Sequence, residues 1–221
     1  AAVYYPESGR VEGERLLLPV KEGEKGLRQS DAVFHHTSRL PQVLSALSKR
    51  TGFETEGVCA SVRPCPEEGS YMPCFLVGKN AAVCACVAAK APLFSTTHQH
   101  GHIAAALYGA GKLELLHERF LAFHLSGGTT EALIVEPDEN EVFMPRVVAR
   151  SLDLKAGQAV DRVGLMLSMK FPCGAQLDSL AQKSERRFKI KPSMKGDCCS
   201  LSGVENKCRE MLLRGEPEED V

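Results

Sequence analysis

The chain has 221 residues, of which 43% are hydrophobic and 25% are charged, and its formal net charge is −1 at pH 7. Such a composition is typical of a globular protein with one large or two modest domains and a sizeable core. The near-zero charge excludes a global attraction to nucleic acid or anionic lipid, so such a partner would need a local patch, for which residues 183–195 are the candidate. No apolar run reaches the roughly 18 residues of a transmembrane helix, so we expect a cytoplasmic protein without membrane contact.

The nine cysteines are scattered along the chain without a CxxC pair. An odd number at irregular spacing does not indicate a disulfide framework or a zinc knot. We therefore expect reduced thiols that are mostly buried as small apolar side chains.

Strands and helices alternate in the N-terminal half. The predicted elements are a hairpin over 2–18, a helix over 40–48, a strand over 57–62, a helix over 75–90 and a strand over 92–95. The polar residues 26–36 are expected to be irregular, with His35 and His36 near the start of the first helix. The order strand, helix, strand over 57–95 is typical of a βαβ crossover.

The C-terminal half begins with strands and ends with helices. The predicted elements are a strand over 119–125, a hairpin with strands over 131–136 and 141–148, and helices over 152–169, 175–182 and 204–213. The basic run 183–195 separates the last two helices, and it is either a solvated loop or a nucleic-acid contact.

His98 and His102 stand four residues apart, just before a predicted short helix over 103–107. At that spacing two imidazoles share one helical face and can bind one metal ion. The alternative is a solvated helix start in which the spacing is incidental. His35, His36 and His117 carry no such pattern and are expected at the surface or in a satisfied core position.

His124 ends the predicted strand 119–125 and is followed by Ser126-Gly127-Gly128-Thr129. The backbone amides of a glycine pair are unhindered and could wrap a phosphate. The alternative is a tight hairpin turn in which the glycines only permit a positive φ.

Five segments line up, in order, with one known family. They are His98-Gln99-His100-Gly101-His102, Leu125 to Thr130, Gly157 to Arg162, Pro172-Cys173-Gly174 and Cys199 to Val204. Together they resemble the glycoprotease family, once called O-sialoglycoprotein endopeptidases (peptidase M22) and now understood as tRNA threonylcarbamoyladenosine transferases. The resemblance covers about residues 30–221.

The resemblance implies an α/β fold of the actin-like ATPase (ASKHA, ribonuclease H-like) class. Each of its two lobes would be a mixed sheet flanked by helices. Residues 1–118 would form the N-terminal lobe that carries the HxxxH motif, and residues 119–221 a partial second lobe that carries the SGGT turn. The chain would then be a divergent member cut short at both ends, with its second lobe incomplete.

The activity implied is transfer of threonylcarbamoyl from its adenylate to N6 of the tRNA adenosine next to the anticodon, with an iron or zinc ion in the site. The resemblance makes His98 and His102 metal ligands, and His124 stands where some relatives carry a metal-binding tyrosine. It assigns ATP or the threonylcarbamoyl-adenylate to a set of seven residues, with Asp161 on the ribose: Leu125, Ser126, Gly127, Gly128, Thr129, Asp161 and Gly174. No catalytic side chain is implied.

Several family features are replaced or absent. His100, Thr129 and Cys173 stand where the family has glutamate, histidine and glycine, and the first phosphate loop and a late metal-binding aspartate have no counterpart. The alternative function is therefore a catalytically idle paralogue that acts as a scaffold or dimerisation partner, with a protein partner or a second copy bound.

A metalloprotease is the third reading of the sequence. A zincin needs a glutamate directly after its first histidine as general base, and Gln99 occupies that position. A glutamine side chain cannot take a proton from water. For Asp161, the alternative to a ribose-binding role is an exposed ion pair with Arg162, which would contribute little to stability.

Overall fold

The computed structural model describes residues 1–19 and 27–221, which form two compact units, residues 1–113 and 114–221. Residue 26, where the predicted irregular stretch begins, lies outside the described residues. Among the described residues, no helix is long and apolar enough to span a bilayer. All nine cysteines are free, but only Cys86, Cys173 and Cys208 are buried, so the expectation of mostly buried thiols is wrong.

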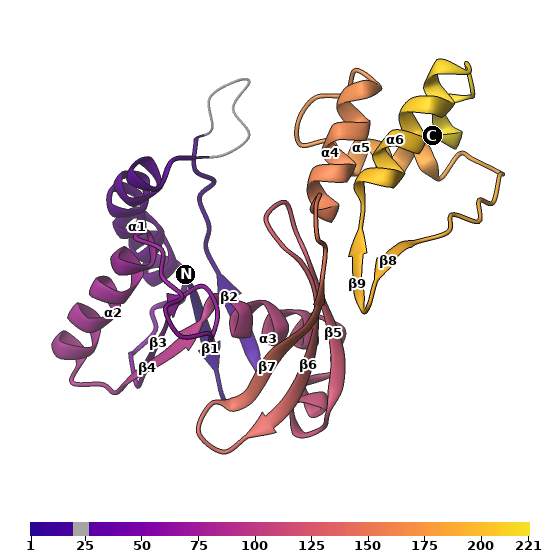
Figure 1. Cartoon of the computed structure of the whole chain (residues 1–221). Helices are drawn as coiled ribbons and strands as arrows, with labels where there is room; N and C mark the ends of the chain where they lie inside the picture. The colour runs from indigo at the N-terminus through magenta and orange to yellow at the C-terminus, as the bar shows by residue number, and fades with distance from the viewer. Residues whose placement is uncertain (20–26) are drawn as a thin grey trace. The chain divides into compact units, whose positions relative to one another are not determined.

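The first unit contains a hairpin, a parallel strand pair and three helices (Figure 1). Its elements are β1 (Ala2–Tyr5), β2 (Arg10–Gly13), α1 (Gln29–Thr51), β3 (Val58–Arg63), α2 (Phe75–Ala89), β4 (Leu93–Thr97) and α3 (His98–Ala110). A 3-10 helix, η1 (Leu113–His117), follows α3.

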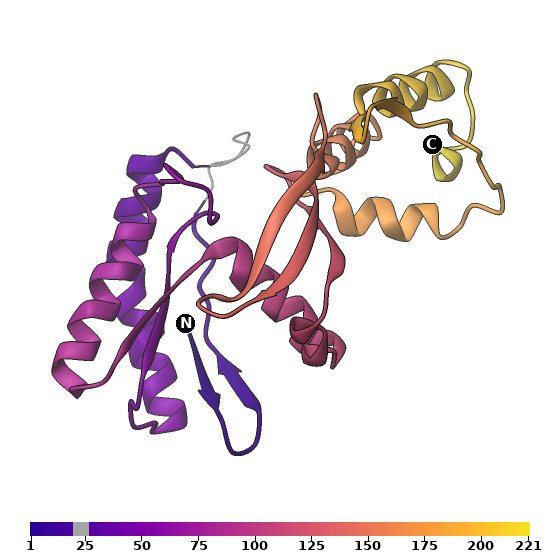
Figure 2. The same ribbon diagram turned by 60° about the horizontal axis from the view of Figure 1, so that its bottom comes forward.

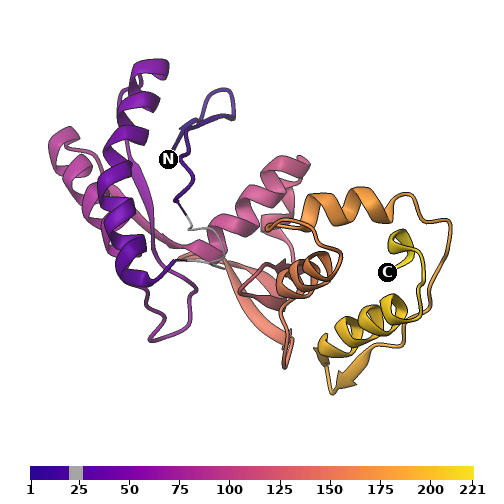
Figure 3. The same cartoon turned by 90° about the horizontal axis from the view of Figure 1, so that it is seen from above.

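The hairpin and the βαβ crossover of the first unit are confirmed. β1 pairs antiparallel with β2, although β2 ends at Gly13 instead of extending to residue 18. β3 and β4 pair in parallel with Val58 opposite Leu93, and α2 crosses between them and packs on β3. α1 lies beside α2, as the view from above shows (Figure 3).

α1 begins at Gln29, so the prediction of irregular structure over 29–36 is wrong. Its ends carry the charges that a helix dipole favours, with Asp31 in the first turn and Lys49 and Arg50 in the last. Gly52 ends the helix in the left-handed conformation with φ of 59°, which glycine adopts without steric cost. Hydrophobic periodicity alone predicted too short a helix, and the charged residues and the glycine at its ends mark its true bounds.

The second unit consists of a three-stranded sheet, a small hairpin and three helices. Its elements are β5 (Phe120–Leu125), β6 (Thr130–Asp138), β7 (Val142–Arg150), α4 (Ala156–Met166), α5 (Gly174–Ala181), β8 (Ser193–Lys195), β9 (Cys198–Ser200), α6 (Ser202–Leu213) and the 3-10 helix η2 (Glu218–Asp220). The predicted strands over 119–148 are confirmed, whereas β8 and β9 are not predicted from the sequence.

β5, β6 and β7 form an antiparallel meander (Figure 2). One face of this sheet is buried. Leu133, Val135 and Phe143 lie on the buried face and are at most 4% exposed. The opposite face carries three large exposed side chains of β5: Leu121, Phe123 and Leu125. The strands therefore alternate as a half-buried sheet should.

The fold is mixed α/β, but the expected mixed sheet in each lobe is not observed among the described residues. Hydrogen-bonded strands form four separate small sheets, β1-β2, β3-β4, β5-β6-β7 and β8-β9, of which only β3-β4 is parallel. The α/β class inferred from the sequence is correct at this coarser level.

α4 spans 156–166 and not the predicted 152–169, because the residues before it form a loop around Asp153. Oδ1 of Asp153 accepts the backbone N–H of Leu201 at 2.8 Å, and Oδ2 accepts the hydroxyl of Ser202 at 2.5 Å. The hydrogen bond from the Ser202 side chain, followed by that from the Leu201 backbone, holds the pKa of the Asp153 carboxyl far below its ordinary value. Asp153 thus caps the N-terminus of α6 from a distant part of the chain.

Replacing Asp153 with asparagine should lower the free energy of unfolding at pH 7 by about 1 kcal/mol, because one acceptor oxygen is lost and hydrogen bonds to a charged acceptor are stronger than those to a neutral one by about this amount. The carboxylate contributes stability above its unfolded pKa of about 3.9 and loses it as the pH falls through the lower folded value. Urea denaturation of wild type and Asp153→Asn should therefore show a gap at pH 7 that narrows below about pH 4. Asp197→Asn, at an exposed position in the same unit, is the control; a gap that widens in acid would contradict the assignment.

Candidate functional site

His98 and His102 lie together on the first turns of α3. Their Nε2 atoms are 2.9 Å apart, with ring centroids at 4.2 Å and an interplanar angle of 70°. The ring of Phe75 packs edge-on against that of His98, with 5.8 Å between the ring centroids. The spacing of four residues has therefore placed both imidazoles on one helical face, as predicted.

The Nε2 atoms of His98 and His102 lie at the distance of a hydrogen bond between the two rings. Histidine nitrogens bind zinc at about 2.0–2.1 Å in a tetrahedral shell, so two such ligands lie about 3.3 Å apart. A shared ion would therefore require the two Nε2 atoms to separate by about 0.4 Å. Within either unit, the described residues gather no third His, Cys, Asp or Glu around these two, so the pair supplies part of a coordination shell.

The first turn of α3 is fixed by Thr97, which the sequence did not single out. Its hydroxyl oxygen accepts the backbone N–H of His100 at 3.2 Å and lies 2.6 Å from Nδ1 of the same residue. Thr97 and His100 are both buried. A threonine just before a helix is a common N-cap, so this signal was available in the sequence.

Gln99 is buried, and its neutral amide side chain cannot act as a general base. Its backbone N–H donates to the carbonyl oxygen of Pro64 at 2.9 Å, which ties α3 to the loop after β3. His124 lies half-buried on β5 of the other unit, where it is opposite Glu131 in the strand register. Its part in a metal site therefore stays a prediction.

The turn after β5 is closed by its own serine. Ser126 Oγ accepts the backbone N–H groups of Gly128 at 3.2 Å and Thr129 at 2.9 Å, and Ser126 N donates to Thr129 O at 2.7 Å. Two of the amides expected to face a phosphate thus already have an acceptor in the protein. A phosphate at this turn would have to replace Ser126 Oγ or share these donors.

The segment 126–129 is a tight hairpin turn between β5 and β6, as the alternative held. Gly127 and Gly128 have no φ in the left-handed region, so the positive φ expected of these glycines is wrong. A Cβ atom added at either position would meet nothing within 4 Å. Gly174 also has room for a Cβ atom, which would make only an ordinary contact of 3.9 Å with Val160. Packing within the described chain does not require glycine at these three positions.

The first turn of α4 packs directly on this turn. Ala156 N donates to Thr130 Oγ1 at 2.7 Å, and Gly157 N donates to Ser126 O at 3.1 Å. A Cβ at Gly157 would lie 2.7 to 2.9 Å from backbone atoms of Ser126 and Gly127. Glycine is required at position 157 because two backbones approach each other there.

Asp161 holds the turn that precedes α5. Its Oδ1 accepts the backbone N–H of Cys173 at 2.9 Å. The alternative ion pair between Asp161 and Arg162 is wrong, because Arg162 binds Glu205 of α6 at 3.1 Å.

Cys173 is completely buried against α4. A Cβ added to Gly164 would lie 2.3 Å from Cys173 Cβ, so the cysteine fills the space that this glycine leaves. Burial, and next the negative charge of Asp161, raises the pKa of the Cys173 thiol. The side chain is a neutral packing element.

Two histidines stand together at the start of α3, and a glycine-containing turn packs on the start of α4. These features make the chain a candidate metal- and nucleotide-binding protein. Residues 21–221 match the family described as TsaD: tRNA N6-adenosine threonylcarbamoyltransferase. The chain belongs to this family, as its motifs indicated.

Curated relatives carry the same description. The chain is 25% identical to the tRNA N6-adenosine threonylcarbamoyltransferase of Archaeoglobus fulgidus over 216 residues, which are 97% of the chain and 62% of that protein. It is 36% identical to that of Pediococcus pentosaceus over 119 residues, 54% of the chain and 32% of the relative. For Methanopyrus kandleri the identity is 25%, over 89% of the chain and 54% of the relative. The chain thus spans between about a third and three-fifths of the length of these relatives.

Replacing Gly157 with alanine should displace the turn 126–129 and destabilise the second unit by about 1–3 kcal/mol, the usual cost of overpacking. Gly203→Ala, at a helical position where a Cβ meets nothing within 4 Å, is the matched control and should be neutral or slightly stabilising. Thermal and urea denaturation of both variants measure the difference. Equal stability of the two variants would contradict the close approach.

Proposed function

We propose that the full-length protein transfers a threonylcarbamoyl group from its adenylate to N6 of the adenosine next to the anticodon of a tRNA. The observation that carries this proposal is the pair of Nε2 atoms of His98 and His102, 2.9 Å apart, in a chain of this family. The names of the curated relatives support the same reaction.

In this reaction the adenosine nitrogen N6 forms a bond to the carbamoyl carbon, and the bond from that carbon to the adenylate oxygen breaks. AMP leaves with the electron pair, and N6 loses a proton. No side chain needs to become covalently attached, so the chain's task is to hold and orient two substrates.

His98 and His102 would hold a divalent iron or zinc ion, with His124 as a proposed third ligand. When bound, the ion supplies Lewis-acid polarisation of the acyl carbonyl. The packing of Phe75 and the Thr97 cap fix the helix start on which the two imidazoles stand, so both rings are oriented before any ligand arrives.

The adenylate, or ATP, would lie on the turn of the second unit. Leu125 leads into the turn, and Ser126 to Thr129 would donate backbone N–H groups to phosphate oxygens. Asp161 would accept a ribose hydroxyl, and Gly174 would let the nucleoside approach the backbone. The open space beside the glycines supports this proposal, because nothing in the described chain occupies it.

The two units would be lobes of an actin-like ATPase fold, the second of them partial in this chain. A second candidate function is a catalytically idle scaffold or dimerisation partner. It is favoured by one observation, which is that Ser126 Oγ already accepts two of the turn's amides. The protease reading is not proposed, because buried Gln99 stands in place of the general base.

Purified full-length protein should contain close to one equivalent of iron or zinc, and His98→Ala/His102→Ala should lose it, because each imidazole supplies one bond to the ion. Elemental analysis after desalting measures both. The double variant His35→Ala/His36→Ala, on α1, is the matched control and should keep its metal. No iron or zinc in the wild-type protein, together with no change in the double variant, would defeat the metal assignment.

Gly127→Ala/Gly128→Ala should weaken binding of ATP or a threonyl-adenylate analogue by about tenfold, equal to about 1.4 kcal/mol, because two methyl groups would stand beside the amides. The thermal midpoint should change little, since both positions are open and outside the left-handed region.

Isothermal titration calorimetry separates the two candidate functions. Saturable heat in the wild-type protein, reduced in the glycine variant, supports the transferase. Absence of heat with either nucleotide supports the scaffold and excludes the proposed nucleotide site.

A further inference from the structure

Residues 183–195 carry the strongest local charge of the chain, with six basic side chains and one acidic side chain in a protein of net charge −1. Residues 184–192 form neither helix nor strand, and the ribbon passes from α5 to β8 without regular structure (Figure 1). Every side chain from 185 to 195 is exposed. The segment therefore contributes charge to the surface and little to the core.

Arg186 anchors the beginning of this basic segment. Its guanidinium pairs with Glu216 at 2.8 Å and Asp220 at 3.1 Å, and it lies 4.7 Å over the ring of Phe188. Ser184 adds a hydrogen bond to Asp220 at 2.5 Å. The segment is thus held against the C-terminal turn of the unit, so its later residues start from a fixed point.

Four further cations of the segment differ from Arg186 in their pairing. Within the part of the chain that the structure describes, no ion pair involves Arg187, Lys189, Lys191 or Lys195. Their mutual repulsion is relieved only by counterions, which a polyanion would release on binding. This arrangement favours a partner with several closely spaced negative charges.

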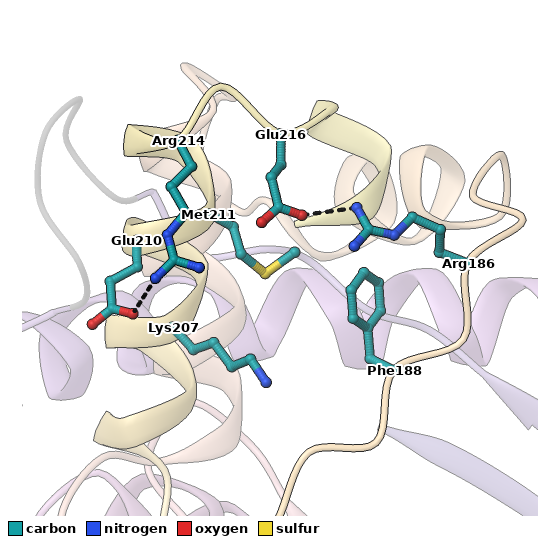
Figure 4. Close-up of a pocket in the computed structure, with 7 residues that line it drawn as sticks. All are labelled: Arg186, Phe188, Lys207, Glu210, Met211, Arg214 and Glu216. Carbon is teal, nitrogen blue, oxygen red and sulfur yellow. Dashed lines mark hydrogen bonds and ion pairs between the residues drawn. The ribbon is translucent and has the colours of Figure 1, made fainter.

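A groove of about 240 Å³ lies between the basic segment and α6. Figure 4 shows Arg186 and Phe188 on one side of it and Lys207, Met211 and Arg214 on the other. Its acidic residues, Glu216 and Glu210, are paired with Arg186 and, at 3.8 Å, with Arg214. Among the residues placed in the structure, no carboxylate pairs with Lys207, whose ammonium lines the groove together with the Phe188 ring, which is 40% exposed.

We infer that this groove and the basic segment form a docking surface for the sugar–phosphate backbone and one unstacked base of a single-stranded RNA loop. Lys207, Arg187, Lys189 and Lys191 contact phosphates, and the Phe188 ring stacks on the base. The identity of the RNA as the acceptor tRNA rests on the proposed function. An anionic membrane is the competing partner, because Ile190 and Met194 are also exposed, but neither contributes to the groove.

Binding of an unmodified tRNA transcript to the full-length protein, followed by fluorescence anisotropy from about 50 to 200 mM salt, tests this inference. Arg187→Gln/Lys189→Gln/Lys191→Gln should reduce the slope of log affinity against log salt by about 2, because each single-strand phosphate contact contributes about 0.7. Lys49→Gln/Lys79→Gln/Lys170→Gln removes the same charge from exposed positions elsewhere and should leave the slope unchanged.

The stacking contact is tested separately. Phe188→Ala should weaken tRNA binding at least about fivefold without changing the salt slope, and Phe188→Trp should restore it. If the ring had only a structural role, its loss would disturb the basic segment and change the salt slope together with the affinity.

Equal salt slopes in the two triple variants would overturn the inference. So would segment-dependent binding to vesicles of phosphatidylserine and phosphatidylcholine with no segment-dependent tRNA binding, because the partner would then be a membrane. A protein that binds tRNA through this surface but transfers no threonylcarbamoyl group would support the surface and refute the proposed function.

Discussion

The second unit depends on the close approach between the first turn of α4 and the turn 126–129. Two N–H groups at the helix start, which would otherwise lack acceptors, are bound by Thr130 and Ser126. Gly157 permits this contact because a Cβ there would overlap backbone atoms. Asp161 stands four residues after Gly157 and so shares its helical face. One contact thus sets the turn, the helix and the candidate ribose ligand in a fixed relation.

Much of the fold follows from local sequence signals. Turn residues and apolar alternation predicted the first hairpin, the strand β5 and the hairpin β6–β7, and the strand–helix–strand order predicted the parallel pair β3–β4. Other parts depend on contacts between distant residues. β8 and β9 have three residues each, too few for a periodic pattern, and the α6 cap comes from Asp153, 48 or more residues earlier in the chain.

The candidate site was predictable to the extent that it is local. A spacing of four residues places His98 and His102 on one face, where their Nε2 atoms lie within hydrogen-bond distance of each other. The occupation of two turn amides by Ser126 Oγ was not predictable, because an exposed serine hydroxyl can rotate toward solvent or toward its own backbone. Asp161 shows the same limit, since its bond to Cys173 arises from the packing of α4 against the next helix start.

The position of the histidine pair also constrains the rest of a metal site. Neutral imidazoles bring no negative charge, and the N-terminus of α3 presents the positive end of the helix dipole. A divalent cation at this place would therefore meet an unfavourable field unless an anionic ligand compensates it. Such a ligand is either a carboxylate from elsewhere in the full-length protein or the phosphate or carboxylate of a bound substrate. In the second case the metal and the substrate would each strengthen the binding of the other, because the coupling between two ligands is reciprocal.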